Sequence, residues 1–303
     1  MRQILATLAL VFGLSAVAHA HPGWGIVVDG AGNVFYTDLK QVWKIEPSGK
    51  KSVGVPSVHT HELLLDAGGN LYGEHLWYEA ARDEWWRRVW QLSPQGRLSE
   101  LIPAARLEAE WWSGALRDFT FVQDAAGNMY WPAGEPGPEQ TLVKKRAPDG
   151  SITTLAGGAA RPGDGHGAAA GFSALGRMTV GPDGNLYVMD AGALRRVSPA
   201  GDVRTRARGL DEKSLTTFDV GPLHRVMGLA ADALGNVYVA NYGARQVKKV
   251  GPDGKVTVFL RSRLPWSPAG VAVSGNTVYV LEYAINRVRV RKVTAEGRVT
   301  TLP

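Results

Sequence analysis

The amino-acid sequence predicts an all-β fold, a six-bladed β-propeller whose blades are four-stranded antiparallel sheets. Two sequence signals that each recur six times carry this prediction, and the 303-residue length suits one large β domain. Four strands with one buried face cannot hide their apolar surface alone. Each copy must therefore pack against the next, and six copies that close in a ring form a propeller.

The first signal is an apolar stretch, a turn that carries Gly-Asn, and a second apolar stretch. Gly supplies a positive φ, and Asn or Asp hydrogen-bonds its own backbone, so the middle of each copy is a turn. Val, Ile, Leu and Tyr flank the turn at strand-like lengths, which predicts a hairpin of two strands, here called a and b. The six copies lie at 25–38, 62–75, 121–133, 178–190, 228–241 and 270–282.

The second signal is a short strand that ends in a Gly-containing turn. It predicts a second hairpin, made of strands c and d, in each copy. Its six copies lie at 45–50, 92–97, 146–151, 197–202, 250–255 and 293–298. We therefore expect one propeller domain at 21–303, with blades at about 21–56, 57–101, 115–156, 173–206, 224–260 and 267–303.

The copies share a core of Gly-Asn, a hydrophobic residue, Tyr, Val, any residue and Asp. In this core, and in the glycine-rich connection at 155–172, the chain resembles the NHL-repeat propellers over nearly all of its length after residue 20. The resemblance implies a rigid ring that the chain enters at strand a of the first blade and leaves at strand d of the sixth. The ring would then close by side-chain packing, without a strand borrowed from the other terminus.

The N-terminus has the three-part pattern of a secretory signal peptide. Residues 1–3 are short and basic, residues 4–18 are almost entirely apolar, and Ala-His-Ala at 18–20 ends the run with small residues. The apolar run is shorter than the ~20 residues of a membrane-spanning helix. We expect cleavage after residue 20 and a bacterial periplasmic or secreted protein. The chain has no cysteine, so its core alone must stabilise it.

The formal net charge of +6 and the pI near 9.5 come from dispersed basic residues. Short clusters at 87–88, 144–146 and 287–292 are typical of solvated strand faces. Anionic lipid, polysaccharide or nucleic acid is the alternative partner that such charge attracts. No recognition helix accompanies the charge, and export argues against nucleic acid. We expect a monomer with no membrane span.

Loops that join one blade to the next, and loops that join strands b and c, lie on one face of a propeller, here called the top face. The long insertions fall in those loops, and elaborated loops on one face of a rigid scaffold are where ligands usually bind. We expect long loops at 76–88, 102–118, 133–140, 156–175 and 206–226.

Seven of the ten tryptophans belong to blades 2 and 3, most of them in predicted top loops. They would form either an aromatic platform for a sugar, ring or lipid-like ligand, or a small core of a long loop. Several arginines and tyrosines, with Arg117 among them, are expected near the same face. The predicted ligand-binding residues are Trp24, Trp77, Trp85, Trp86, Trp111, Trp112, Tyr242, Tyr283, Arg177 and Arg225.

Three histidines fall in one blade, which raises the hypothesis of a metal site. The turn at 66–70 sets a register in which His61 faces His75, at a Cβ separation of about 4.5–5.5 Å. The same register places Glu62 opposite Glu74, and opposed carboxylates repel unless a cation or proton lies between them. The hypothesis is a divalent metal, zinc or calcium. The alternatives are a hydrogen-bonded polar cluster or solvated loop residues. The proposed ligands are His59, His61, His75, Glu62 and Glu74.

Polar residues also end strand b in most other blades, where they would ring the channel mouth. They would act as metal ligands or bases, or they would cap the following turn. The residues are Asp38, Asp190, Asn241 and Glu282, with Ala133 in blade 3. His21, His166 and His224 are isolated and are expected to be structural or surface residues.

Three functions remain open. The first is a binding module for a small molecule, glycan or protein. The second is a metal-dependent hydrolase or lyase that resembles gluconolactonase-like lactonases, streptogramin lyases or peptidyl-hydroxyglycine lyases. The chain departs from these because three of its histidines belong to a single blade, so the analogy is one of fold. The third is an interaction scaffold. The sequence assigns no catalytic residue.

Overall fold

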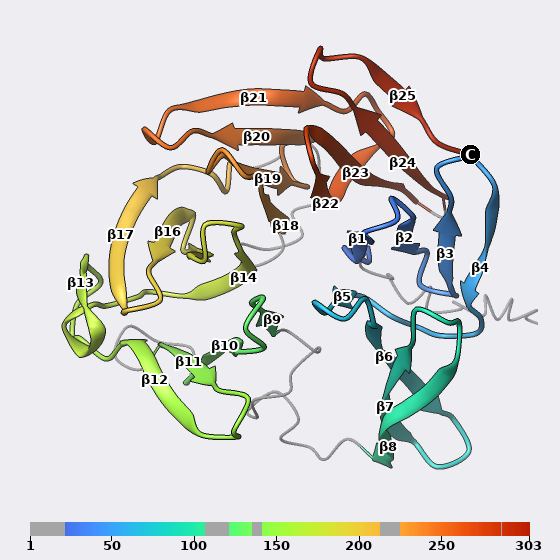
Figure 1. Cartoon of the computed structure of the whole chain (residues 1–303), viewed down its shortest axis with the longest axis horizontal. Helices are drawn as coiled ribbons and strands as arrows, with labels where there is room; N and C mark the ends of the chain where they lie inside the picture. Colours follow the sequence, from blue (N-terminus) through green and yellow to red (C-terminus); the bar gives the residue numbers. More distant parts are fainter. Residues whose placement is uncertain (1–21, 107–120, 135–140, 213–224, 286) are drawn as a thin grey trace, which may run out of the picture.

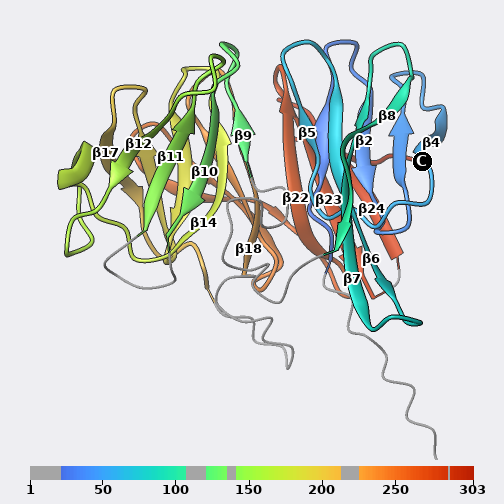
Figure 2. The ribbon, with the colours of Figure 1, turned by 90° about the horizontal axis from the view of Figure 1, so that it is seen from below.

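The computed structural model describes residues 22–106, 121–134, 141–212, 225–285 and 287–303. In these residues the strands form six antiparallel sheets arranged around an axis, with the innermost strand of each sheet facing the centre (Figure 1). Seen from the side, the sheets stand upright next to one another (Figure 2). The fold predicted from the repeats, a propeller with six four-stranded blades, is confirmed.

The first three blades are consecutive in sequence, and each contains four strands in chain order. Their strands are β1 (Ile26–Val28), β2 (Val34–Thr37), β3 (Val42–Ile45), β4 (Lys51–Val55), β5 (Leu64–Leu65), β6 (Leu71–Glu79), β7 (Glu84–Leu92), β8 (Leu98–Arg106), β9 (Val122–Gln123), β10 (Met129–Ala133), β11 (Leu142–Arg146) and β12 (Ile152–Gly157).

The last three blades follow the same order, and the fourth gains a short fifth strand, β13, on its outer edge. The elements are β13 (Gly165–His166), the single-turn helix η2 (Gly167–Ala169), β14 (Leu175–Val180), β15 (Leu186–Asp190), β16 (Ala193–Val197), β17 (Asp202–Ala207), β18 (Val226–Ala231), β19 (Val237–Asn241), β20 (Gln246–Val250), β21 (Val256–Arg261), β22 (Ser267–Ser274), β23 (Thr277–Ala284), β24 (Arg287–Val293) and β25 (Val299–Thr301).

The turn between strands a and b is locked by the same Asp and Asn in successive blades. In blade 2, Asp66 accepts hydrogen bonds from the backbone N–H and side-chain amide of Asn70, at 2.8 and 2.9 Å. The hydroxyl of Tyr72 donates a third bond to Asp66, at 2.7 Å. Asp124 in blade 3 and Asp232 in blade 5 hold the equivalent position and accept the same three kinds of bond. In blade 4, Asp183 accepts them from its place two residues before Asn185, while Gly181 stands at the equivalent position.

Apolar cores lie between neighbouring blades. The described residues contain five such clusters, which join blades 1 and 2, 3 and 4, 4 and 5, 5 and 6, and 6 and 1. The cluster between blades 6 and 1 includes Ile26 and Leu281, and no sheet mixes strands from the two ends of the described chain. Blades 1 and 6 therefore meet by side-chain packing.

Two predicted loops are largely strand. The segment expected as a loop at 76–88 extends β6 and β7, because cross-strand pairing continues without a break from Leu71–Leu92 to Glu79–Glu84. Likewise β8 continues to Arg106, inside the connection expected at 102–118.

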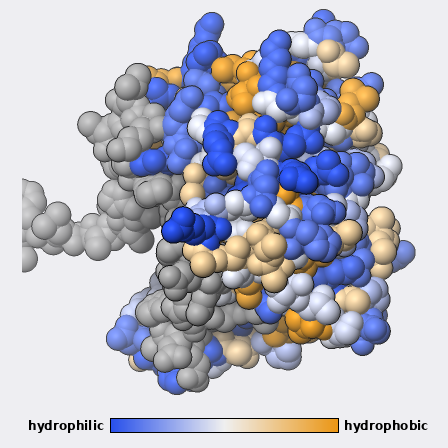
Figure 3. All heavy atoms as spheres, turned by 90° about the vertical axis from the view of Figure 1, so that its left-hand side faces the viewer, coloured by the Kyte–Doolittle hydropathy of each residue, from blue (hydrophilic) through white to orange (hydrophobic). Residues whose placement is uncertain are grey.

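Among the described residues, no helix has the length and apolar character needed to cross a bilayer. The side of the ring that carries β13 and β17 is mostly hydrophilic (Figure 3).

Candidate functional site

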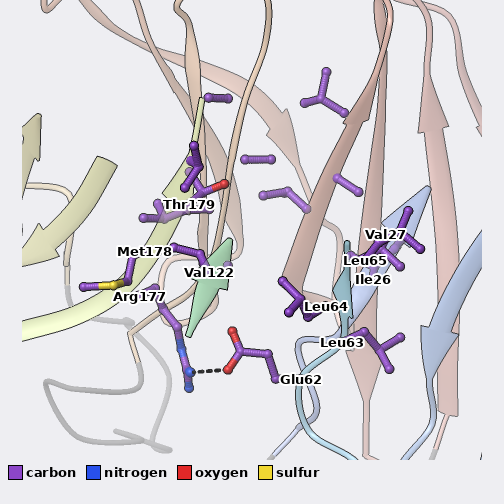
Figure 4. A pocket seen from close by; sticks show the side chains of 18 of the residues that line it. Ile26, Val27, Glu62, Leu63, Leu64, Leu65, Val122, Arg177, Met178 and Thr179 are labelled. Atoms are coloured by element: carbon purple, nitrogen blue, oxygen red, sulfur yellow. Dashed lines mark ion pairs between the residues drawn. The ribbon is translucent and has the colours of Figure 1, made fainter. Parts of the chain in front are cut away.

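The innermost strands of all six blades surround a central channel of about 460 Å³. Strand a of each blade contributes β1, β5, β9, β14, β18 or β22, so the channel is a direct product of the repeat. Most of its lining side chains are aliphatic, and Figure 4 shows Leu64 and Val122 among them, but polar groups share the exposed wall. Such a wall suits a small ligand that has both apolar and polar parts.

Two charged residues face each other at one end of this channel. The Arg177 guanidinium lies 3.7 Å from the Glu62 carboxylate, and both side chains are less than a fifth exposed (Figure 4). Arg177 also stacks over the indole of Trp24, 3.5 Å from the ring centroid. The other neighbour of Trp24 is the imidazole of His61, stacked at 5.5 Å. The ion pair links blade 2 to blade 4 in a partly desolvated setting, where each charge interacts more strongly than in water.

The positions that correspond to this charged pair in blades 1, 5 and 6 are glycines. A Cβ on Gly270 would lie 2.2 Å from the backbone oxygen of Trp24, and one on Gly228 would lie 2.9 Å from the oxygen of Ala269. Gly25 is similarly crowded by blade 2. Only glycine permits these close approaches between inner strands. The mouth is therefore asymmetric, closely packed on one side and charged on the other. An alignment of the six repeats would have shown this contrast, but not that the charged residues form a pair.

The three histidines of blade 2 lie close together, with the rings of His59 and His61 4.7 Å apart, but His61 and His75 direct Nδ1 to different partners. His75 Nδ1 accepts a hydrogen bond from the His59 backbone N–H at 2.8 Å, and its ring stacks on Trp77 at 4.9 Å. His61 Nδ1 instead lies 3.7 Å from a carboxylate oxygen of the fully buried Glu74. Burial, together with the nearby Arg88 and His59, lowers the pKa of His75 to about 4.

The five residues predicted as metal ligands do not form a coordination site in the described structure. Within the described ranges, no group of three or more His, Asp or Glu residues could hold a metal ion. The predicted register does hold at Leu65 and Leu71, but strand β5 is only two residues long. Before it, the Leu76 N–H bonds the His59 carbonyl, which shifts the pairing by one residue. Glu62 and Glu74 also have different partners, since Glu62 pairs with Arg177.

The polar residues that end strand b hold turns and blade connections in place. Asp38 accepts hydrogen bonds from two backbone N–H groups of its own turn and from Trp43 Nε1. Asp190 accepts from the N–H groups of Ser173 and Ala174, and its other oxygen lies 2.7 Å from Arg195. These contacts correspond to the turn-capping alternative, in which the carboxylates fix the backbone.

The same pattern continues in the last two blades. Asn241 donates to the Leu210 carbonyl at 2.8 Å and accepts from the Ala244 N–H at 2.8 Å. Glu282 accepts from the Ser262 hydroxyl and from Arg289 Nε. The side chains of Asn241 and Glu282 are fully buried, so neither is presented to a ligand.

The tryptophans of blade 2 form pairs on the extended β6–β7 hairpin. Trp77 and Trp86 are opposed across the strands and stack at 6.2 Å, while Trp85 lies 5.4 Å from Tyr78 on the opposite face. Trp85 is half exposed. The hairpin is therefore a structured element that carries aromatic rings on both faces.

The remaining predicted residues are buried, exposed or outside the described ranges. Tyr283 is buried and donates its hydroxyl to the Thr37 carbonyl at 2.8 Å, so it is a structural residue. Tyr242 packs against the core between blades 6 and 1, and Arg225 is buried. His166 pairs with Asp202 at 3.0 Å. The predicted residues outside the described ranges are Trp111, Trp112, Arg117, His21 and His224, with parts of the loops expected at 102–118, 133–140 and 206–226.

No known protein family and no curated protein sequence matches this chain. Solved structures do resemble it. A streptogramin B lyase is 13% identical at a TM-score of 0.52, over 92% of this chain and 82% of that chain. A gluconolactonase from Xanthomonas campestris is 14% identical at a TM-score of 0.53, over 89% and 86%. A chain of a nidogen–laminin complex is 14% identical at a TM-score of 0.57, over 89% and 92%. At these identities the likeness concerns the fold alone, and the chain is a six-bladed β-propeller of four-stranded antiparallel blades.

Proposed function

We propose that this chain is an exported, NHL-type propeller that binds a ligand at the charged mouth of its central channel. The observation that carries the proposal is the Glu62–Arg177 ion pair at one end of an aliphatic channel of about 460 Å³. The ligand would place an apolar part in the channel. Its polar end would form hydrogen bonds with Arg177 and Glu62. A small molecule fits this volume, since typical ligand pockets measure about 300–1,000 Å³.

The guanidinium of Arg177 is the group best placed to recognise the polar end. The indole of Trp24 holds it from one side, which fixes its orientation before a ligand arrives. A preorganised arginine loses little conformational freedom when it binds a carboxylate, phosphate or lactone oxygen. Glu62 would then accept a hydrogen bond from a ligand hydroxyl or amine. The two residues together favour a ligand that carries both a donor and an acceptor near one end.

A thermal-shift screen against alkyl lactones, oligosaccharides and short peptides, followed by calorimetric titration of the best compound, tests the proposal. Replacing Arg177 by Met keeps the stem over Trp24 and removes the charge. We expect Arg177→Met to weaken binding about tenfold or more, the loss typical of a charged hydrogen bond. Glu62→Gln should have a smaller effect, because the amide still accepts a hydrogen bond.

Arg298→Gln is the matched control, because Arg298 is an exposed arginine in a turn at the opposite end of blade 6. It should leave the affinity unchanged. Equal affinity in the wild type and in Arg177→Met would contradict the proposal. So would a screen in which no compound of the three classes raises the melting temperature.

A metal-dependent hydrolase or lyase is the second candidate, favoured by the fold of the streptogramin B lyase and the gluconolactonase. The described histidines of blade 2 do not fit a metal, since His75 accepts a backbone N–H through Nδ1 and turns its ring onto Trp77. Elemental analysis of the purified protein, with and without His61→Ala and His75→Ala, tests this candidate. Stoichiometric zinc or calcium that both variants lose would favour it over the binding module.

Export and the NHL type are parts of the same proposal. The apolar run at 4–18 and the Ala-His-Ala at 18–20 support cleavage and export. The Asp–Asn–Tyr turn that recurs at equivalent positions supports the NHL type. N-terminal sequencing of the protein from a bacterial periplasmic extract would test export, with His21 as the expected first residue.

A further inference from the structure

The top end of blade 6 carries two of the most exposed aliphatic side chains in the described part of the protein. Ile285 is 91% exposed and Leu264 is 69% exposed. Ser267 at the start of β22 pairs with Tyr283 near the end of β23, so the segments that contain Leu264 and Ile285 flank the same end of this sheet. Burying exposed aliphatic side chains of this size is favourable, and two of them at the same end of one sheet point to a partner surface.

Ile285 is held outward by an unfavourable backbone. Ala284 pairs with Arg287, which makes Ile285 the first residue of the turn, and its φ is 52°. A β-branched residue rarely adopts a positive φ, because its side chain collides with the backbone. Asn or Gly would fit this position without strain. Non-glycine residues with positive φ also stand in the b–c turns of blades 1, 4 and 5, at Leu39, Ala191 and Arg245, so the conformation belongs to this turn of the repeat, and blade 6 places an exposed isoleucine in it.

Arginines are concentrated in the segments that contain these aliphatic side chains and in the neighbouring turn of blade 5. The segments 242–246, 261–267 and 282–291 contain six arginines and a single acidic residue, Glu282. Glu282 is buried and already pairs with Arg289 and Arg291. Among the described residues, Arg261, Arg263 and Arg287 form no ion pair, and all three are exposed. Clustered positive charge without a counter-charge is unfavourable unless an anionic partner neutralises it.

Trp266 connects the exposed aliphatic residues with the arginines. Its ring receives the guanidinium of Arg289 at 4.1 Å and that of Arg287 at 5.5 Å. Its backbone N–H bonds the carbonyl of Arg263, so the tryptophan and the exposed arginines belong to one compact turn. Tryptophan with arginine and exposed aliphatic residues is the composition that prefers the interface between lipid head groups and acyl chains.

We propose that this surface, the blade 6 patch formed by Arg261, Arg263, Leu264, Trp266, Ile285 and Arg287, docks the protein on an anionic lipid bilayer. The arginines bind lipid phosphates, and Leu264 and Ile285 enter the head-group region. Charge alone would suit any polyanion. The two exposed aliphatic side chains favour a membrane over a soluble polyanion, because only a bilayer offers them an apolar environment. The attachment is peripheral and reversible, since two short side chains insert.

Co-sedimentation with vesicles tests the patch. The full-length protein is mixed with vesicles of phosphatidylcholine alone, or with about one third phosphatidylglycerol, and the bound fraction is measured. We expect binding that depends on phosphatidylglycerol. The double variant Arg263→Gln, Arg287→Gln should lower the partition coefficient about 25-fold, because each basic residue near such a surface contributes about a factor of five. Leu264→Ser with Ile285→Ser should lower it about tenfold.

A matched control is available at the opposite end of blades 5 and 6. Leu234 is 73% exposed in the β18–β19 turn, and Arg298 is exposed in the β24–β25 turn. Leu234→Ser with Arg298→Gln should bind vesicles like the wild type. All variants keep the apolar residues 4–18, so a contribution of that segment is common to every sample. Circular dichroism and melting temperature verify that each variant is folded.

Three results would overturn the proposal. One is equal binding to neutral and anionic vesicles in the wild type. Another is unchanged binding in the arginine variant. The third is capture by dextran sulfate that competes with vesicles while Leu264→Ser with Ile285→Ser has no effect, which would assign the arginines to a soluble polyanion.

Discussion

At the scale of single residues, the position at the predicted end of strand b has the same structural role in several blades, although the amino acid differs. In five of the six blades, the residue at the predicted end of strand b has a side chain whose hydrogen bonds fix a turn or a blade connection. In blade 2 this residue is a histidine, and its Nδ1 accepts the His59 N–H. A histidine can accept only when that nitrogen carries no proton, so the contact requires the neutral ring. The equivalent residues are Asp38, His75, Asp190, Asn241 and Glu282.

His75 should therefore make folding stability depend on pH. Its pKa falls from 6.5 in the unfolded chain to about 4 in the folded protein. Its contribution is complete above pH 6.5, and it is lost between pH 6.5 and 4 because the unfolded state then binds the proton first. We expect a loss of about 1–2 kcal/mol, after a reduction for partial solvent exposure. Urea unfolding at several pH values measures it.

His75→Asn is the informative variant, because Asn241 occupies the same position in blade 5 and its side-chain oxygen accepts a backbone N–H. The variant should unfold with a shallower pH dependence than the wild type and with similar stability near neutrality. Identical pH dependence in the two proteins would show that His75 titrates as it does in the unfolded chain.

The sequence analysis named His61, Glu62 and Arg177 as candidates, but it did not predict the contacts that these residues make. The register set by the turn at 66–70 holds at Leu65, which pairs with Leu71. It does not extend to His61, because the β5–β6 pairing is only two residues long. The contact of Glu62 with Arg177 joins blades 2 and 4, and a register within one blade carries no information on it.

At the scale of elements, the turns were predictable and the strand lengths were not. Gly, Asn and Asp mark each a–b turn, and the observed hydrogen bonds of Asp66 with Asn70 explain that signal. The segment between β6 and β7 has no Gly, Pro or Asn at 76–88, and it pairs almost to its tip. Aromatic and charged cross-strand pairs stabilise such a ladder without any turn signal. Without a turn signal to mark a hairpin, the sequence predicts a loop at 76–88, where the structure has two long strands.

The Asp–Asn lock predicts a graded loss of stability. Burial opposes ionisation of Asp66, but the hydrogen bonds from Asn70 and Tyr72 outweigh it and lower the pKa of this carboxyl. Asp66→Ala removes three side-chain acceptor contacts and should destabilise the protein by about 2–3 kcal/mol. Asp29→Ala in blade 1 should cost less, about 1–2 kcal/mol, since Phe35 replaces the tyrosine there. Guanidinium unfolding ranks the two variants, and the reverse order would refute the role of the tyrosine.

At the scale of the whole molecule, the six-fold repeat determines the ring. The differences between the copies determine which parts of the ring resist local opening. The inner strand of blade 6, β22, has eight residues, and glycines let it pack closely on its neighbours. The inner strands of blades 2 and 3, β5 and β9, have two residues each. Few backbone hydrogen bonds hold such short strands in their sheets. The Glu62–Arg177 pair spans this side of the channel and ties blade 2 to blade 4.

Local opening should therefore begin on the side of β5 and β9. Hydrogen exchange followed by mass spectrometry should show the fastest exchange of inner-strand amides there and the slowest in β22. Glu62→Gln, which keeps the shape and removes the charge, should speed exchange in β5 and β9 about fivefold, the effect of an ion pair worth about 1 kcal/mol. Exchange in β22 should stay the same, because its protection comes from packing between blades 5, 6 and 1. If Glu62→Gln instead accelerates exchange equally in all six inner strands, the ring opens as one unit and the charged pair is not a local tie.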